Sequence, residues 1–158
     1  MIIRDATPAD APQACQVLRD SIAQLCSADH RDDRVVLSRW LANKTPHNVA
    51  SWADGIGRSL LLVVEGEAIV AVGGVKDDGE ITLNYVAPSA RFRGISSALL
   101  AALESRALQR GAVTASLLST ETAHRFYLAR GYHDEGPPVG KFGTAASYPM
   151  TKVLVPHG

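Results

Sequence analysis

The sequence predicts a mixed α/β (α+β) fold with a mostly antiparallel central sheet. Three consecutive apolar runs are too short for helices, and the turns between them contain Glu65-Gly66-Glu67 and Asp77-Asp78-Gly79, which is the pattern of an antiparallel meander. A helix-length segment separates the third run from a fourth, and a connection of that length places two strands parallel. The four strands are expected over residues 60–64, 68–72, 80–86 and 113–118.

Helices are predicted before and after this meander. Following a short strand over 2–4, Thr7-Pro8-Ala9-Asp10 has a capping residue, a proline at the first helical position and an acid at the third, which is typical of a helix start. That helix should run to about Cys26 and be followed by a polar loop over 26–30. The other expected elements are helices over 33–43, from Thr45, over 95–109 and over 121–130, strands from Tyr132 and over 147–155, and a loop over 136–146.

Length and composition favour one domain covering residues 1–158, because 158 residues support one core and no change in composition divides the chain. Sixteen basic residues balance sixteen acidic ones, which gives no reason to expect a nucleic-acid or membrane partner. No signal peptide is visible, nor an apolar run of ~20 residues, so a cytoplasmic location is expected. The five histidines and two cysteines lack the spacing of a metal site, and no metal is expected.

The most informative stretch is residues 86–100, which reads as a strand end, a basic turn and the opening of a helix. The first backbone N–H groups of a helix have no partner inside it, and here they follow Arg91 and Arg93. Gly94 lets an anion approach the backbone without a Cβ in the way, and two serines after it add hydroxyl donors. The residues alone leave two interpretations open, a phosphate-binding helix start and a solvated basic turn.

Two motifs carry a family resemblance. Arg91-x-x-Gly94-x-Ser96 resembles the (Gln/Arg)-x-x-Gly-x-(Gly/Ala) signature of the GCN5-related N-acetyltransferase (GNAT) family. Residues 123–132 resemble that family's later motif, Ala-x-x-Phe-Tyr-x-x-x-Gly-(Phe/Tyr), in the expected order along the chain. The resemblance implies acetyl-CoA as co-substrate, bound by the strand, loop and helix of residues 80–110. It also implies a GNAT-like sheet in which a parallel strand pair splays apart, with helices on both faces.

The same resemblance implies how acetyl-CoA is held. The N–H groups of residues 93–97 would bind the pyrophosphate, the strand end at Tyr85 and Val86 would hydrogen-bond the amide-rich arm, and the Val86 N–H would polarise the thioester carbonyl. Two positions depart from the family pattern, since Ser96 replaces a glycine or alanine and Thr120 stands where many members have asparagine. The expected acetyl-CoA-binding residues are Tyr85, Val86, Arg91, Phe92, Arg93, Gly94, Ile95, Ser96, Ser97 and Thr120.

Tyr127 and Glu80 are the catalytic candidates. By resemblance, the Tyr127 hydroxyl, with an unperturbed pKa near 10, hands a proton to the departing thiolate. The alternative is that Tyr127 and Phe126 only pack under the sheet. Counting back from Gly94 without gaps places Glu80 where some histone-acetylating relatives carry a glutamate that deprotonates the amine. Because Glu80 directly follows a hairpin turn, a merely solvated carboxylate is the alternative.

The acceptor side is expected in residues 20–59, by resemblance. This segment contains Trp40, Trp52 and four aspartates, a mixture that suits an amine-bearing small molecule, although both tryptophans also suit a core. His30 is a candidate for the same pocket but is more typical of a surface histidine. The loop over 136–146 is a candidate lid.

These features predict an N-acetyltransferase that moves an acetyl group from acetyl-CoA to a primary amine of a small molecule or amino-acid-like acceptor, by direct attack in a ternary complex. The alternative is a non-catalytic acyl-CoA-binding or regulatory module, and the role of Tyr127 separates the two. A nucleotide-binding α/β domain is disfavoured, because the loop lacks both Gly-x-Gly-x-x-Gly and Gly-Lys-Ser/Thr. An exposed final strand would allow two copies to pair as a homodimer.

Overall fold

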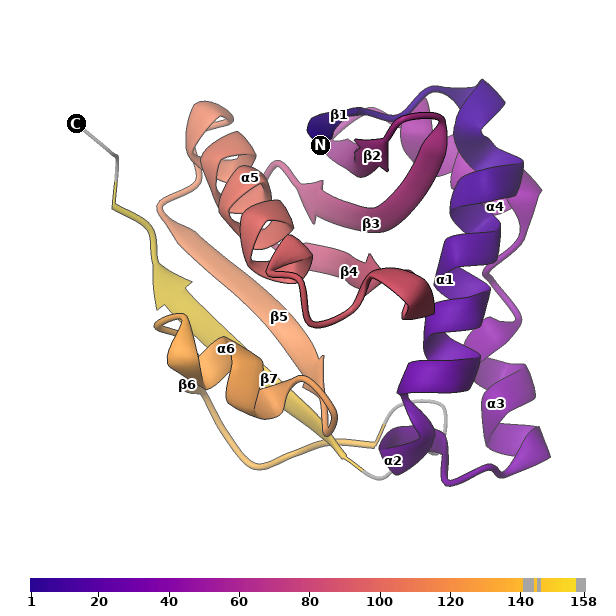
Figure 1. The fold of residues 1–158 in the computed structure, drawn as a ribbon. Helices are drawn as coiled ribbons and strands as arrows, with labels where there is room; N and C mark the ends of the chain where they lie inside the picture. The colour runs from indigo at the N-terminus through magenta and orange to yellow at the C-terminus, as the bar shows by residue number, and fades with distance from the viewer. Residues whose placement is uncertain (141–143, 145, 156–158) are drawn as a thin grey trace.

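Two antiparallel sheets form the centre of the computed structural model, which describes residues 1–140, 144 and 146–155 (Figure 1). The larger sheet has the order β1-β2-β3-β4, from β1 (Ile2–Asp5), β2 (Arg58–Glu65), β3 (Ala68–Lys76) and β4 (Ile81–Val86). The smaller sheet has the order β5-β7-β6, from β5 (Thr114–Thr120), β6 (His133–Asp134) and β7 (Ser147–Val153). The predicted meander is therefore β2, β3 and β4.

The two sheets meet at the start of β4 and β5. Glu80 and Ser116 form an isolated parallel bridge, in which the Ser116 N–H donates to the carbonyl of Gly79 over 3.1 Å. Past this bridge the two strands share no ladder among the described residues, and a cavity lies between their far ends at Val86 and Thr120. The outer edge of β4 is consequently left open where β5 has moved away.

Helices cover both faces of the larger sheet. Because successive strand residues point to opposite faces, Leu60 and Leu62 of β2 pack into a cluster with α1 (Ala11–Leu25) and α4 (Pro46–Ala53), whereas Leu61 and Val63 pack with α5 (Ile95–Gln109). In Figure 1, α1 and α5 accordingly lie on different sides of β3 and β4. The fold class is the one predicted, a mixed and mostly antiparallel arrangement with helices on both faces.

Several element boundaries differ from the prediction. The predicted polar loop over 26–30 is wrong, because Ser27–His30 form the short helix α2. The first helical turn is a 3-10 helix, η1 (Pro8–Asp10), and α1 begins after it. The remaining elements are α3 (Arg34–Leu41), η2 (Pro88–Ala90) and α6 (His124–Ala129), which starts later than the predicted helix over 121–130.

A buried carboxylate joins α2 to the turn that precedes α6. Asp29 of α2 is fully buried and accepts hydrogen bonds from the N–H groups of Glu121 and Thr122 and from the Thr122 hydroxyl. The expected surface position of His30 is also wrong, since this residue is 1% exposed and its Nδ1 accepts from the Asp32 N–H over 3.0 Å. The Asp29 bonds join segments 92 and 93 positions apart, so no local sequence pattern predicts them.

The final strand, β7, differs from the prediction in its position in the sheet. The final strand is not an exposed edge, because β7 is paired with β5 on one side and β6 on the other. The predicted lid over 136–146 includes residues 141–143 and 145, which lie outside the described residues.

Among the described helices, none combines the length and apolarity needed to cross a bilayer.

Candidate active site

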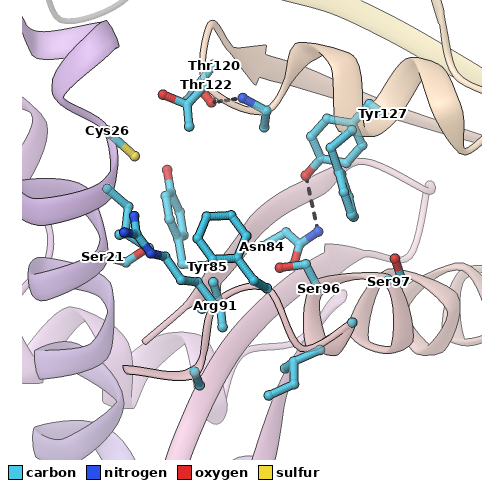
Figure 2. Close-up of a pocket in the computed structure, with 18 of the residues that line it drawn as sticks. Ser21, Cys26, Asn84, Tyr85, Arg91, Ser96, Ser97, Thr120, Thr122 and Tyr127 are labelled. Atoms are coloured by element: carbon cyan, nitrogen blue, oxygen red, sulfur yellow. Dashed lines mark hydrogen bonds between the residues drawn. The ribbon is translucent and has the colours of Figure 1, made fainter. Parts of the chain in front are cut away.

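A cavity of about 430 Å³ lies where β4 and β5 diverge, with walls from α1, the turn into α5, and α6 (Figure 2). Most of the residues predicted to bind acetyl-CoA or to act in catalysis line it. They are Tyr85, Val86, Arg91, Phe92, Gly94, Ile95, Ser96, Ser97, Thr120 and Tyr127. Arg93 and Glu80 are not among the lining residues.

The start of α5 opens into this cavity. Gly94 is the N-cap residue and has a φ of +75°, a left-handed conformation that glycine adopts without strain. The first backbone hydrogen bond of the helix is donated by the Ala98 N–H to the Gly94 carbonyl over 3.2 Å. The amides of residues 95–97 therefore point out of the helix end, where the partial positive charge of the helix dipole also lies. A Cβ built on Gly94 would have no neighbouring atom within 4 Å, so the approach to these amides is clear.

The side chains of the two predicted arginines behave differently. Arg91 lines the cavity, with its guanidinium 4.7 Å from the centre of the Phe92 ring. Arg93 instead forms an ion pair with Glu65 of β2, which raises the pKa of Arg93. Phe92 is 91% exposed and has a φ of +63°, a conformation that costs about 1–2 kcal/mol in a residue with a Cβ. The side-chain charge at the cavity comes from Arg91 together with Arg130, the residue that follows α6.

Tyr127 of α6 both lines the cavity and packs in the core. It is 7% exposed, and its ring contacts those of Phe126 and Tyr132 edge-on, at centroid distances of 5.1 and 5.5 Å. Its hydroxyl accepts a hydrogen bond from Asn84 Nδ2 over 3.3 Å. Burial raises the pKa of Tyr127 to about 12, and the bond from Asn84 opposes that rise. The phenol therefore keeps its proton at neutral pH.

Glu80 and Tyr127 do not share a cavity. The Glu80 side chain is 46% exposed, and its carboxylate lies 3.5 Å from Lys76 Nζ. It lines a separate hollow with Thr82, Ser116 and other residues. The structure thus brings the acid candidate to the predicted cofactor site and leaves the base candidate at the opposite end of β4.

Several side chains that line the cavity were not identified from the sequence, and three of them, Asn84, Arg130 and Cys26, bear on its chemistry. Asn84 lies next to Tyr85 in β4, and asparagine is depleted in strands, which is the signal that could have identified it. Arg130 donates from Nε to Ser97 Oγ over 2.8 Å, which ties α6 to the first turn of α5. Cys26 lines the cavity from the end of α1, and burial raises the pKa of its thiol to about 12, so it stays protonated.

The segment expected to form the acceptor side contributes both core and pocket surface. Trp40 of α3 is 4% exposed, and its core interpretation is therefore correct. It also lines a small pocket with Lys44, Thr82 and Thr120 on the side of the sheet gap away from α5. Asp29, one of the four aspartates of this segment, is buried and holds the turn that follows Thr120. The described residues contain no cluster of three or more histidine, cysteine, aspartate or glutamate side chains able to hold a metal ion.

Comparisons with known proteins agree with this geometry. The family model described as an acetyltransferase (GNAT) domain matches residues 26–154. The chain therefore belongs to the GNAT family of acetyltransferases. A comparison with curated proteins found no match.

Solved structures share the fold over almost the whole chain. A GCN5-related N-acetyltransferase from Rhodopseudomonas palustris has a TM-score of 0.85 at 26% identity, covering 97% of this chain and 95% of that one. A PaiA N-acetyltransferase from Thermoplasma acidophilum, in complex with coenzyme A, has a TM-score of 0.82 at 15% identity, covering 96% and 98%. An aminoglycoside 6'-N-acetyltransferase from Enterococcus faecium has a TM-score of 0.71 at 17% identity, covering 100% and 99%.

Proposed function

We propose that the chain is an N-acetyltransferase that moves an acetyl group from acetyl-CoA to a primary amine of a small molecule or amino-acid-like acceptor. The observation that carries the proposal is the meeting, on one cavity, of an open helix start at Gly94 and the protonated hydroxyl of Tyr127. Family membership and a similar structure in complex with coenzyme A support the donor. The similarity to an aminoglycoside 6'-N-acetyltransferase supports a small-molecule amine as the acceptor.

The residues present suit acetyl-CoA. The amides of residues 95–97 and the Arg91 side chain would hold the pyrophosphate, as helix N-termini commonly hold phosphates. The outer edge of β4 has no ladder partner at Val86 among the described strands. Because the Ala87 N–H bonds to the Val70 carbonyl of β3, the Val86 backbone groups point away from β3 and are free to hydrogen-bond the amides of the pantetheine arm. Thr120 closes the same cavity from β5.

Direct attack needs only these groups and an unprotonated amine. The amine lone pair attacks the thioester carbon, and the Val86 N–H would stabilise the carbonyl oxygen as it becomes negative. The carbon–sulfur bond then breaks with its electron pair on sulfur, and Tyr127 donates its proton to that sulfur. The proton lost by the nitrogen restores the Tyr127 phenol, so the products are the N-acetyl amide and free CoA. Residues 20–59 would supply much of the surface around the amine, and the segment 136–146 is the candidate lid.

Glu80 as the general base stays a prediction from the family resemblance. Glu80→Gln removes a proton acceptor with little change of shape, and Lys76 would remain beside it. If Glu80 accepts the amine proton through water, this change is expected to lower kcat by about 10²-fold. Steady-state kinetics with a saturating amine tests this, and an unchanged kcat would assign Glu80 to the surface ion pair alone.

One observation favours the second candidate, a non-catalytic acyl-CoA-binding module. Among the described residues, the lining of the main cavity contains no aspartate, glutamate or histidine that would serve as a base. An amine that arrives unprotonated needs no such residue, which is why we favour the enzyme. A screen of primary amines for release of free CoA thiol separates the two functions.

The proposal predicts a selective ligand effect on stability. Acetyl-CoA is expected to raise the free energy of unfolding by about 2.7 kcal/mol at a concentration of 100 times its Kd, because it binds only the folded chain. ATP and NAD are expected to produce no comparable shift, since the site is built for a pantetheine arm as well as a diphosphate. A thermal-shift titration with the three ligands measures this, and equal shifts with all three would contradict the proposal.

A further inference from the structure

The Asn84 carboxamide has a hydrogen-bond partner at one of its two ends. Nδ2 donates to the Tyr127 hydroxyl, whereas Oδ1 is buried and has no hydrogen-bond partner among the described residues (Figure 2). Asn84 and Tyr127 line the main cavity together, and they also line a smaller adjoining pocket between β4 and β5. The carboxamide thus lies at the place where the acyl group would react.

The Nδ2 end controls the direction of the Tyr127 proton. A phenol oxygen both accepts and donates, and an amide nitrogen only donates. Because Asn84 Nδ2 fills the accepting role of the Tyr127 oxygen, the phenol O–H is left to donate to another group. Tyr127 lines the cavity, so a sulfur bound there is within the region that this O–H can reach.

The Oδ1 end lacks a donor that a ligand would supply. A buried acceptor without a partner destabilises the empty site, and that cost disappears when a bound molecule brings an N–H group. In acetyl-CoA, the thioester sulfur is separated by only two carbons from the nitrogen of the nearest secondary amide. The sulfur needs a proton, which the Tyr127 hydroxyl can donate. The amide N–H offers a hydrogen bond, which Asn84 Oδ1 can accept.

We propose that Asn84 is a positioning residue for the acid, accepting the pantetheine N–H nearest to the thioester at Oδ1 while Nδ2 holds the Tyr127 hydroxyl toward the sulfur. This assignment rests on the proposed acetyl-CoA-dependent function. It makes donor binding and proton delivery depend on the same side chain. Acyl donors that lack this N–H should therefore lose both affinity and rate.

Two substitutions separate the two ends of the carboxamide. Asn84→Asp keeps an acceptor at Oδ1 but replaces the Nδ2 donor with an oxygen that attracts the phenol proton away from sulfur. We expect its Kd for acetyl-CoA to stay within about threefold and its kcat to fall at least about tenfold. Asn84→Leu removes both the donor and the acceptor and keeps a side chain of similar size. We expect its Kd for acetyl-CoA to rise at least about fivefold and its kcat to fall as far as that of Asn84→Asp. Calorimetry with acetyl-CoA gives Kd, and thiol release with a panel of primary amines gives kcat.

Two controls show whether Asn84 acts through Tyr127 and through the ligand amide. In the double variant Asn84→Leu/Tyr127→Phe, kcat should equal that of Tyr127→Phe within about twofold, because the positioned proton is already absent. An acetyl-CoA analogue methylated on the amide nitrogen nearest the sulfur should bind the unaltered chain at least about fivefold more weakly, and bind Asn84→Leu no more weakly than acetyl-CoA does. Thermal unfolding of each variant separates these effects from loss of folded protein.

The outcomes distinguish this inference from the proposed function. Independent, multiplying effects of Asn84→Leu and Tyr127→Phe, or variants whose Kd and kcat both match those of the unaltered chain, would overturn the role of Asn84 alone. An unaltered chain that takes up no acetyl-CoA, or that takes it up and releases no thiol with any amine, would contradict the proposed function itself.

Discussion

Tyr127→Phe is expected to lower kcat at least tenfold, toward the ~10²–10⁴-fold contribution of a general acid, while Kd for acetyl-CoA stays within about twofold. The substitution removes the hydroxyl that would protonate the leaving sulfur and retains the ring that contacts Phe126 and Tyr132. Steady-state thiol release and calorimetry measure the two quantities separately.

Tyr132→Phe is the matched control for this change. Tyr132 is also buried, its ring lies 5.5 Å from that of Tyr127, and its hydroxyl donates to Glu104 over 2.8 Å. It is not among the residues that line the cavity, so its removal should cost stability and leave kcat unchanged. Equal losses of kcat in both variants would indicate a packing effect, and an unchanged kcat in Tyr127→Phe would favour the binding module.

Gly94→Asp is expected to weaken acetyl-CoA binding at least thirtyfold, which corresponds to about 2 kcal/mol. A carboxylate at this position would stand in front of the amides of residues 95–97 and repel the diphosphate. It would also add a side chain at a φ of +75°, where glycine has an advantage over other residues. Calorimetry at low and high salt checks the result, because screening should reduce the electrostatic part of the loss.

Gly111→Asp supplies the comparison within the same helix. Gly111 follows the other end of α5, has a φ of +95°, and has open space where a Cβ would lie. The two variants therefore introduce the same charge at similar backbone conformations, but at opposite ends of the helix. Gly111→Asp should lower stability and leave Kd for acetyl-CoA unchanged within about twofold. A similar loss of affinity in both variants would rule out a pyrophosphate site at Gly94.

Helix α5 is determined by local sequence patterns. Its apolar residues recur at helical spacing and its ends carry Gly94 and Gly111, and the structure places the helix over Ile95–Gln109, as predicted. Its buried residues pack in one cluster with the sheet. A helix start, a buried stripe and a terminating glycine are all encoded within one segment, so no distant contact was needed to predict them.

The loop predicted over 26–30 shows where local patterns fail. Its polar residues are ordinarily solvated, and here Asp29 is buried because it accepts hydrogen bonds from the turn after β5. Arg93 is a similar case, since its side chain is drawn to Glu65 of β2 and away from the cavity that its neighbour lines. In both places the partner comes from a different part of the chain.

The candidate site also contains residues that the motifs identified and contacts that they could not predict. The two motifs identified the turn at Gly94 and the tyrosine of α6, but they could not show that Asn84 hydrogen-bonds Tyr127 or that Glu80 lies in another hollow. The first depends on how α6 packs across the end of β4, and the second on how β5 and β7 lie beside the start of β4. The Tyr127 alternatives were also not exclusive, since the residue is both core and cavity lining.

The sequence by itself determined the fold class, the strand-turn-helix at Gly94 and the family, because periodicity, turn residues and motifs are properties of neighbouring residues. Only the tertiary structure decided which side chains meet at the gap between β4 and β5. The physical reason is that the hydrogen bonds between Asn84 and Tyr127 and between Asp29 and Thr122 join residues 43 and 93 positions apart. These bonds are strong because folding buries them in a medium of low dielectric constant.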